Sequence, residues 1–546
     1  MLPAHRIHLA AFFALLSLTT SAAWPAVNQQ KRPAPHPARP AAHHPVRRAH
    51  PVRPGARRAE HRAPPAPPFT FDTVKRIAWQ RALSPYRVRS TAIPPALARL
   101  SYSQYQQIRF RPDAALWRGQ SMFNVQFYHR GFAFTRQVRI YEVLPSGVRE
   151  VRYSPSMFTF GRQVPRMRLP WDLGFAGFSI HYPLNAPTRE DAVLAFLGAS
   201  YFRVLGRNQV YGVTSRGLAI DSASVEGEEF PYFTDFWLVP PAPRAQSMTI
   251  YALLDSPSVA GAYQFDVRPG AVTQVTVTAT LYPRARIGKL GIAPLTSMFL
   301  YGRNSARQRF DDWRPQVHDS DGLMMQTGTG EWLWRPLQNP KRLEVNRFMD
   351  DNPRGFGLIQ RDRNFADYED PVAQYERRPS YWVQPLGNWG RGGVELVEIP
   401  STAAVNYNVD AYWVPNAPVE PRRPITFSYV LSSYLSSNTR WPPGGRAVAT
   451  RFGPVLRAGH AVSGMRRVLI DFSGGDLDGL EASQPLRPEI SARGAAISQI
   501  SVQRLPENGH WRVAFDVKPA GSEPVDLRCY LELYDSALTE TWTDQW

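Results

Sequence analysis

Acidic and aromatic side chains come close together in two neighbouring stretches of the sequence, HDSDG (318–322) and GEWLWRP (330–336). A carboxylate beside an aromatic wall is the arrangement with which glycoside-cleaving enzymes hold an acid or a base near a sugar. Asp319, Asp321 and Glu331 are the carboxylates concerned. Asp-Ser-Asp-Gly is equally a good turn sequence, so the residues alone leave chemistry and structure open. A Ser–His–Asp triad is not indicated, because its members must converge in space rather than follow one another.

The aromatic residues are interleaved with polar ones in a way that suits a carbohydrate. On an extended segment Trp332 and Trp334 would share one face, with Arg335 on the other. Further rings follow at Tyr381, Trp382 and Trp389. Many aromatic side chains of a β-sandwich simply form its core. Sugar rings also stack on aromatic faces, however, while a nucleic acid would require dense Lys/Arg runs. We therefore expect an oligosaccharide in a groove, and no nucleic acid.

Motifs for a metal or a nucleotide are missing from the sequence. It contains no HExxH, no Cys/His cluster and no calcium-loop spacing. The stretch RGFGLIQRD (354–362) has glycines but neither GxGxxG nor GK[ST]. We predict no metal site and no cofactor.

The elements that must position these residues are strands. In 274–282 and 510–519 apolar residues alternate with polar ones, as in half-buried strands, and 51 prolines and 37 glycines punctuate the chain. These patterns predict an all-β fold of antiparallel sandwiches. Helices are expected at 72–83, where an aspartate caps the start, and at 188–198, where an acidic first turn and a closing glycine mark the ends.

With 546 residues the chain exceeds what one hydrophobic core usually holds, so two folded domains are expected. The strand pattern breaks near 436–445 and resumes with short strands at about 468–472, 497–504, 511–517 and 527–533. We predict one domain over 69–436, a linker over 437–447 and an immunoglobulin-like sandwich over 448–546. The single cysteine, Cys529, is expected to be a buried thiol.

The first 68 residues predict export followed by a linker. A weakly basic start, an apolar run over 9–18 and small residues before position 27 indicate a secretory signal peptide over 1–26. That run is shorter than the roughly 20 residues of a spanning helix, so we expect no transmembrane segment in the mature protein. Residues 27–68 are rich in proline, arginine and histidine and carry much of the net charge of +19. This composition predicts a disordered basic linker.

Long segments resemble the glucans biosynthesis protein D and G family. They include DLGFAGFSIHYP (172–183), LGASYFRVLG (197–206), KLGIAPLTSMFLYG (289–302), HDSDG, GEWLWRPLQNP and NPRGFGLIQRDRNFADYED (352–370). The likeness runs from about residue 69 to the end, and the ending is more similar to the D form. It implies a periplasmic protein that is needed to make osmoregulated periplasmic glucans, which are β-1,2-linked glucose chains. It also implies a large N-terminal β-sandwich with a long cleft and a C-terminal immunoglobulin-like domain.

Family members include inverting β-1,2-glucanases and related transglycosylases, which implies roles for two positions. The base corresponds to Asp319, and the position of the acid, an aspartate in the family, corresponds to Tyr407. A phenol with its ordinary pKa of about 10 is a weaker proton donor than a carboxylic acid. Asp410 is a possible substitute acid, but on a regular strand it would face away from Tyr407. Other candidates for a moved acid are Asp321, Glu331 and Asp351.

Two functions therefore stay open. The chain could cleave or transfer β-1,2-glucan, or it could be a non-catalytic glucan-binding protein or scaffold that docks on the membrane glucan synthase. In either case the predicted glucan-binding residues are Asp321, Glu331, Trp332, Trp334, Arg335, Tyr381, Trp382 and Trp389.

Overall fold

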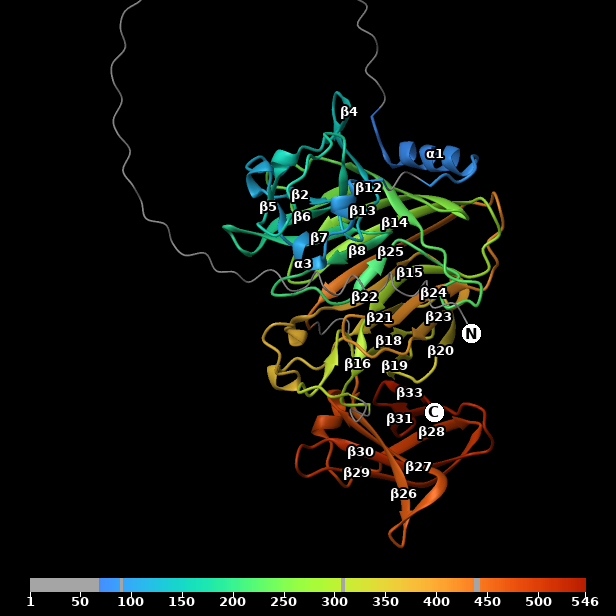
Figure 1. Ribbon diagram of the computed structural model, residues 1–546. Coiled ribbons are helices and arrows are strands. Elements are labelled where there is room, and N and C mark those ends of the chain that lie inside the picture. The colour runs from blue at the N-terminus through green and yellow to red at the C-terminus, as the bar shows by residue number, and fades with distance from the viewer. Residues whose placement is uncertain (1–67, 89–91, 306–309, 437–441) are drawn as a thin grey trace, which may run out of the picture. The chain divides into compact units, whose positions relative to one another are not determined.

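Strands dominate the computed structural model, which describes residues 68–88, 92–305, 310–436 and 442–546 (Figure 1). The predicted signal peptide (1–26) and all but the last residue of the predicted basic linker lie outside the described residues, as does part of the predicted linker over 437–447. Among the described helices, none is both long enough and apolar enough to cross a membrane.

Two large sheets make up most of the fold. The first has the order β2 (Asn124–His129), β6 (Phe175–Ala186), β7 (Arg189–Leu197), β8 (Tyr201–Val204), β9 (Thr214–Arg216), β15 (Leu290–Ser297), β24 (Val409–Pro415), β23 (Arg391–Glu398) and β20 (Glu344–Asp351), with β10 (Ala219–Ile220) beside β15. The second has the order β28 (Arg487–Arg493), β31 (Asp526–Leu533), β33 (Thr541–Gln545), β19 (Trp332–Pro336), β18 (Gly322–Gln326), β21 (Gly355–Ile359), β22 (Ser380–Leu386), β25 (Ile425–Tyr434), β14 (Thr273–Pro283), β13 (Val259–Arg268), β12 (Met248–Asp255), β11 (Tyr232–Leu238), β3 (Arg139–Leu144) and β4 (Gly147–Glu150), with β32 (Ser536–Ala537) beside β31.

Smaller elements complete the described structure. They are the pairs β1 (Ile108–Phe110) with β5 (Phe158–Phe160) and β16 (Phe299–Tyr301) with β17 (Val317–His318), and the sheet β26 (Arg446–Arg457), β27 (His460–Ser473), β30 (Trp511–Pro519) and β29 (Ala495–Arg504). The helices are α1 (Phe71–Ala82), α2 (Pro95–Ala98) and α3 (Tyr102–Tyr105), with 3-10 turns η3 (Pro112–Ala114), η4 (Pro155–Met157), η6 (Phe365–Asp367), η7 (Tyr375–Arg377) and η8 (Gly475–Gly479).

Aromatic side chains join the two large sheets face to face. The ring of Phe196 on β7 lies 4.9 Å from that of Phe236 on β11 and 5.1 Å from that of Phe265 on β13, measured between centroids. All three are almost completely buried. Burial of a phenylalanine side chain contributes roughly 1.5–3 kcal/mol, so this contact layer is a large part of what holds the sandwich together. The predicted all-β sandwich architecture is confirmed.

Of the two expected helices, one is confirmed and one is wrong. Residues 72–83 correspond to α1, which buries Val74 and Ala78 against Trp237, Leu253 and Ala262 of the second sheet. Within 188–198 the chain instead forms the strand β7 (Arg189–Leu197), paired with β6 and β8. Residues 193–197 are buried, and a short apolar run of this kind does not distinguish a helix from a central strand. The Pro187–Thr188 signal marks a hairpin turn instead.

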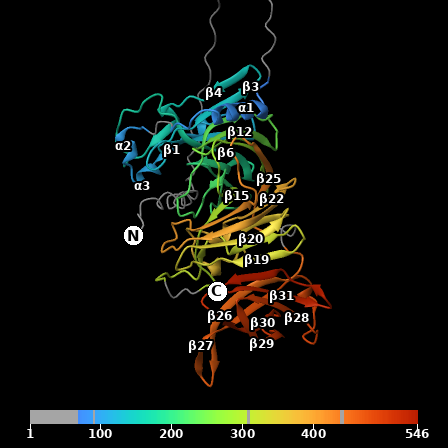
Figure 2. The same ribbon diagram turned by 90° about the vertical axis from the view of Figure 1, so that its right-hand side faces the viewer.

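The C-terminal strands form a sandwich whose second layer is continuous with the large sheet. Their core includes Phe472, Trp511 and Trp542 together with Cys529, so the prediction of a buried thiol is confirmed. β33 pairs in parallel with β19, with Trp542 opposite Trp334. Figure 2 shows the C-terminal strands (red) adjoining β19. The exact domain boundaries stay predictions.

Candidate functional site

A buried ion pair lies at the centre of the candidate site. Asp319 follows β17, and its backbone N–H donates to the carbonyl of Met298 at 2.8 Å. Its carboxylate accepts a hydrogen bond from Arg378 Nη1. The guanidinium of Arg378 also lies 4.0 Å from the ring centroid of Tyr375. Burial lowers the pKa of Arg378, but the charge of Asp319, its hydrogen bond and the neighbouring phenols of Tyr375 and Tyr407 together raise the pKa above its ordinary value. Arg378 is therefore held in its charged form beside the Asp319 carboxylate.

Tyr407 lies in the electrostatic field of this pair. Its hydroxyl donates to the carbonyl of Gly212 at 3.0 Å and accepts from Arg203 Nη2 at 3.1 Å. Burial raises the pKa of Tyr407; Arg203 lowers it and the charge of Asp319 raises it further, leaving it above the ordinary value. The hydroxyl of Tyr407 therefore both donates and accepts a hydrogen bond. With its raised pKa it is a poorer acid than an exposed tyrosine.

Two local features bring these side chains together. Gly212 has no side chain, and a Cβ atom there would lie 2.8 Å from Cβ of Arg378, so glycine allows the arginine to pass close to the carbonyl that Tyr407 binds. Asn408, the residue after Tyr407, uses its side-chain amide to bind both the N–H and the carbonyl of Phe299, each at 2.9 Å. These contacts fix the backbone on which Tyr407 sits.

The centre is closed in this structure. Only 1% of Asp319 is exposed, and Tyr407 is 6% exposed. The cavity beside Arg203, lined also by Tyr128 and Tyr211, has a volume of about 20 Å³. That is close to the space one water molecule needs and far too small for a glucose ring. Asp319 and Tyr407 are thus covered by other residues, and a sugar could reach Asp319 only after the surrounding segments move apart.

Asp410 has its own partners, separate from those of Tyr407. It lies on β24, where its carboxylate accepts a 2.5 Å hydrogen bond from Thr296 and lies 3.4 Å from Arg216 Nη2. Arg216 pairs in turn with Glu228. Burial raises the pKa of Asp410, Arg216 lowers it and Glu228 raises it again. Its role as a substitute acid stays a prediction.

The predicted glucan-binding residues are divided between the two faces of the second sheet. On β22 the hydroxyl of Tyr381 donates to the carbonyl of Val204 on β8 at 2.7 Å, so this side chain is turned towards the first sheet. Trp382, the next residue, is turned to the other face and stacks on Trp332, with ring centroids 5.6 Å apart. Trp334 is buried on this outer face beneath the C-terminal strands. The two-residue period of a strand explains the division.

The remaining predicted residues make contacts of other kinds. Glu331 accepts hydrogen bonds from Arg528 at 2.5 Å and Thr541 at 2.7 Å, both from C-terminal strands. Arg335 lies 3.6 Å from Asp544. Trp389 is half-buried and donates to the carbonyl of Ser428 at 3.2 Å.

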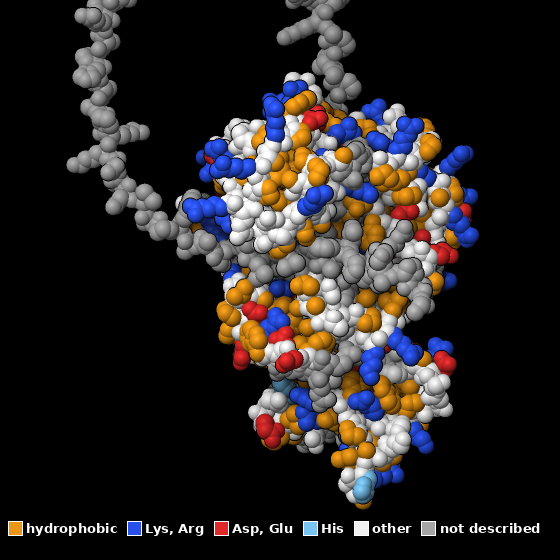
Figure 3. Space-filling model, viewed as in Figure 1, with side chains coloured by type: hydrophobic (Ala, Val, Ile, Leu, Met, Phe, Trp, Pro, Cys, Tyr) orange, Lys and Arg blue, Asp and Glu red, His pale blue; other side chains and the backbone are white. Residues whose placement is uncertain are grey.

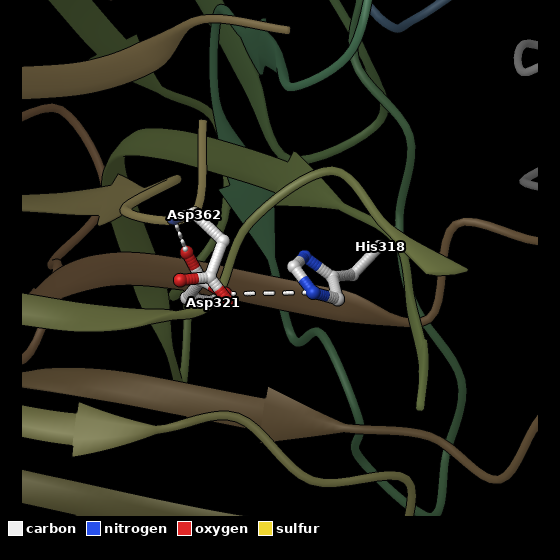
Figure 4. Close-up of side chains that lie close together, drawn as sticks. All are labelled: His318, Asp321 and Asp362. Atoms are coloured by element: carbon white, nitrogen blue, oxygen red, sulfur yellow. Dashed lines mark hydrogen bonds and ion pairs between the residues drawn. The ribbon is translucent and has the colours of Figure 1, made fainter. Parts of the chain in front are cut away.

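Asp321 belongs to a compact cluster with His318 and Asp362 (Figure 4). His318 Nε2 lies 3.4 Å from Asp321 Oδ1, and the other carboxylate oxygen of Asp321 accepts from the backbone N–H groups of Arg361 and Asp362. Burial and the charge of Asp321 raise the pKa of Asp362. The atoms of His318, Asp321 and Asp362 that could bind a metal ion lie within 4.8 Å of one another. His318 also lies within hydrogen-bond distance of Gln360 and Gln316, so we interpret the cluster as a buried hydrogen-bond network on the segment that carries Asp319.

Sequence reasoning missed the arginines of the site. Arg203 and Arg378 are the cations beside Tyr407 and Asp319, and both are more than nine-tenths buried. A signal was present, because Arg203 interrupts an apolar run in SYFRVLG (200–206). A charged residue inside a central strand is rare unless it is paired.

On the face drawn in Figure 3, acidic and basic side chains are interspersed rather than gathered in one basic patch.

Comparisons with known proteins agree on one family. A family model described as "Periplasmic glucan biosynthesis protein, MdoG" matches residues 69–546. Glucans biosynthesis protein D 1 of Ralstonia nicotianae is 46% identical over 499 residues, which cover 88% of this chain and 92% of the relative. Glucans biosynthesis protein G of the same organism is 44% identical over 488 residues (87% and 95%), and protein G of Rhodopseudomonas palustris is 44% identical over 482 residues (88% and 94%).

Proposed function

The chain belongs to the family of periplasmic glucan biosynthesis proteins, and from this membership we propose that it acts in the periplasm in the synthesis of glucans by binding a β-1,2-linked glucan chain. The relatives are named for glucan biosynthesis. The side chains of 318–413 include aromatic, amide and charged groups of the kinds that bind a neutral sugar chain, although Asp319 and Tyr407 are covered in this structure.

We further propose that the chain binds glucan without cleaving it. The observation that carries this is the state of Tyr407 at the position of the family's acid. A general acid must release its proton to the leaving oxygen, and a buried phenol with a raised pKa is poorly suited to this. One carboxylate oxygen of the expected base, Asp319, already accepts a hydrogen bond from Arg378.

The second candidate is a slow hydrolase or transglycosylase. It is favoured by the position of Asp319, which keeps the base of the family close enough to Tyr407 to act on its pKa. Asp410, three residues after Tyr407 in the chain and with a pKa that burial raises, is the carboxyl group that would have to replace the acid.

Incubation of the purified full chain with linear β-1,2-glucan separates the two candidates. Binding is measured by calorimetry and chain length by mass spectrometry, with Asp319→Asn as the comparison. Binding with unchanged chain length supports the binding function. Shortened or cyclised products that disappear in Asp319→Asn would establish the enzyme, and a failure to bind would overturn both.

A further inference from the structure

The outer face of strands β18, β19, β21 and β22 is only partly covered. Met324, Trp334 and Ile359 on this face are buried in one hydrophobic cluster with the C-terminal strands. Further along the same strands the cover ends, and Gln326, Trp332 and Gln384 border a groove of about 670 Å³. A volume of this size lies within the usual range for ligand pockets, about 300–1,000 Å³.

The floor of the groove is a pair of stacked indoles. Trp382 is 4% exposed. It occupies the space above Gly355, where a Cβ atom would lie only 2.2 Å from the indole ring. Trp332 stacks on it with ring planes 27° apart and is half-buried, so it is the more accessible ring. The lower indole therefore fixes the upper one, which is how an aromatic platform keeps its orientation without a ligand.

The rim of the groove carries polar groups that the protein itself does not use. Among the described residues, no hydrogen bond or ion pair holds the side chains of Gln326, Gln384 or Arg354. Asn352, also on the rim, adopts a left-handed backbone with φ of 55° and places its side chain against the turn at Gly390. The described lining contains no carboxylate. Amide and guanidinium groups around an indole suit a neutral ligand with many hydroxyls.

We propose that this groove is a second binding site for a neutral glucan chain, in which a sugar ring stacks on Trp332 and hydroxyls bind Gln326, Gln384 and Arg354. The inference rests on the proposed glucan-binding function and adds a separate site to it. Asp319, Arg378 and Tyr407 do not line the groove. Tyr381 and Trp382 are consecutive residues, so the closed centre and the groove lie on opposite faces of β22. A long chain could be held at the groove while the centre stays closed.

The test compares binding of linear β-1,2-glucan to the full chain and to three variants by affinity electrophoresis and calorimetry. Trp332→Ala removes the upper ring. The double variant Arg354→Ala with Gln384→Ala changes only exposed rim residues and leaves the packing intact, so it remains informative if Trp332→Ala fails to fold. Trp171→Ala is the matched control, because Trp171 is 80% exposed and lies outside the groove.

We expect Trp332→Ala to weaken binding roughly tenfold, as loss of a central aromatic contact does at other binding surfaces. The double variant should bind more weakly as well, and Trp171→Ala should bind like the unmodified chain. Unchanged affinity in folded Trp332→Ala, or in the double variant, would overturn the groove and leave the proposed function standing. An unmodified chain that binds no glucan would overturn both.

Discussion

The Asp319 carboxylate and the Arg378 guanidinium form an ion pair that the fold buries almost completely, with 1% and 7% of the two residues exposed. Removing one member of such a pair leaves the other charge in a low-dielectric environment without compensation. We expect Arg378→Met to lower the free energy of unfolding by about 3–5 kcal/mol, measured by urea denaturation.

The double variant Asp319→Asn with Arg378→Met is the control for this prediction. It removes both charges, so it should be clearly more stable than Arg378→Met alone. If the double variant loses the sum of the two single losses, Asp319 and Arg378 do not stabilise each other.

Tyr407 offers a gain-of-function test. Tyr407→Asp places a carboxyl group where the family resemblance predicts the general acid, within the electrostatic reach of Asp319. If the missing acid is what prevents cleavage, this variant should shorten linear β-1,2-glucan at a rate about 10²-fold or more above that of the unmodified chain. Product chain length over time is the measurement. Tyr407→Asn is the matched control, since asparagine has the shape of aspartate but no acidic proton. Equal rates in the two variants would contradict the explanation.

Glu398 should make stability depend on pH. Burial raises its pKa to about 7 from an ordinary 4.5, although the charge of Arg335 opposes this. Between these values the folded protein keeps a proton that the unfolded chain has lost, so the free energy of unfolding should fall as pH rises from 4.5 to 7, by about 3 kcal/mol in total. Asp544, whose pKa burial raises to about 6, acts in the same direction.

The measurement is the urea midpoint at several pH values between 4.5 and 7.5. Glu398→Gln should flatten the fall in stability, because the amide cannot titrate. Glu523→Gln, at an exposed position, should leave it unchanged. A Glu398→Gln protein with the full pH dependence would show that other groups are responsible.

Gly355 lies against the Trp382 ring and leaves no space for a side chain. A methyl group there would meet the Trp382 ring, so Gly355→Ala should cost about 1–3 kcal/mol through overpacking and should displace the Trp332–Trp382 stack. Thermal unfolding and near-UV circular dichroism measure the two effects. Gly453→Ala is the control on another strand, because a Cβ atom at Gly453 has no neighbour within 4 Å among the described residues, and it should be close to neutral.

The strand pattern could be predicted because it depends on local alternation. Residues 274–282 alternate in the sequence, and β14 alternates in burial accordingly. The same period correctly places Trp332 and Trp334 on one face. It could not predict the strand β7, because a run that is buried on both sides lacks alternation and its turn signals resemble helix caps.

The candidate site was predictable only in its position along the chain. Asp319 was a candidate from its own sequence and its role came, like the position of Tyr407, from the family resemblance. Their partners Arg203 and Arg378 lie far from them in sequence. Pairing between distant strands decides which arginine reaches which acid. The spacing of residues in 318–413 does not show which face of the sheet is covered by the first sheet and which by the C-terminal strands. It therefore could not predict the different surroundings of Tyr381 and Trp382.

The parallel pairing of β33 with β19 has a consequence for how the protein is made. β19, which carries Trp334, pairs on one edge with β33, which carries Trp542 and follows more than two hundred residues later. That edge of β19 stays unpaired until β33 has been synthesised. Until residues 541–545 have emerged, β19 is an open edge that can join to another chain. Contacts between such distant segments also form slowly. An incomplete chain would therefore be the aggregation-prone species, and holding it unfolded until synthesis is finished would protect it.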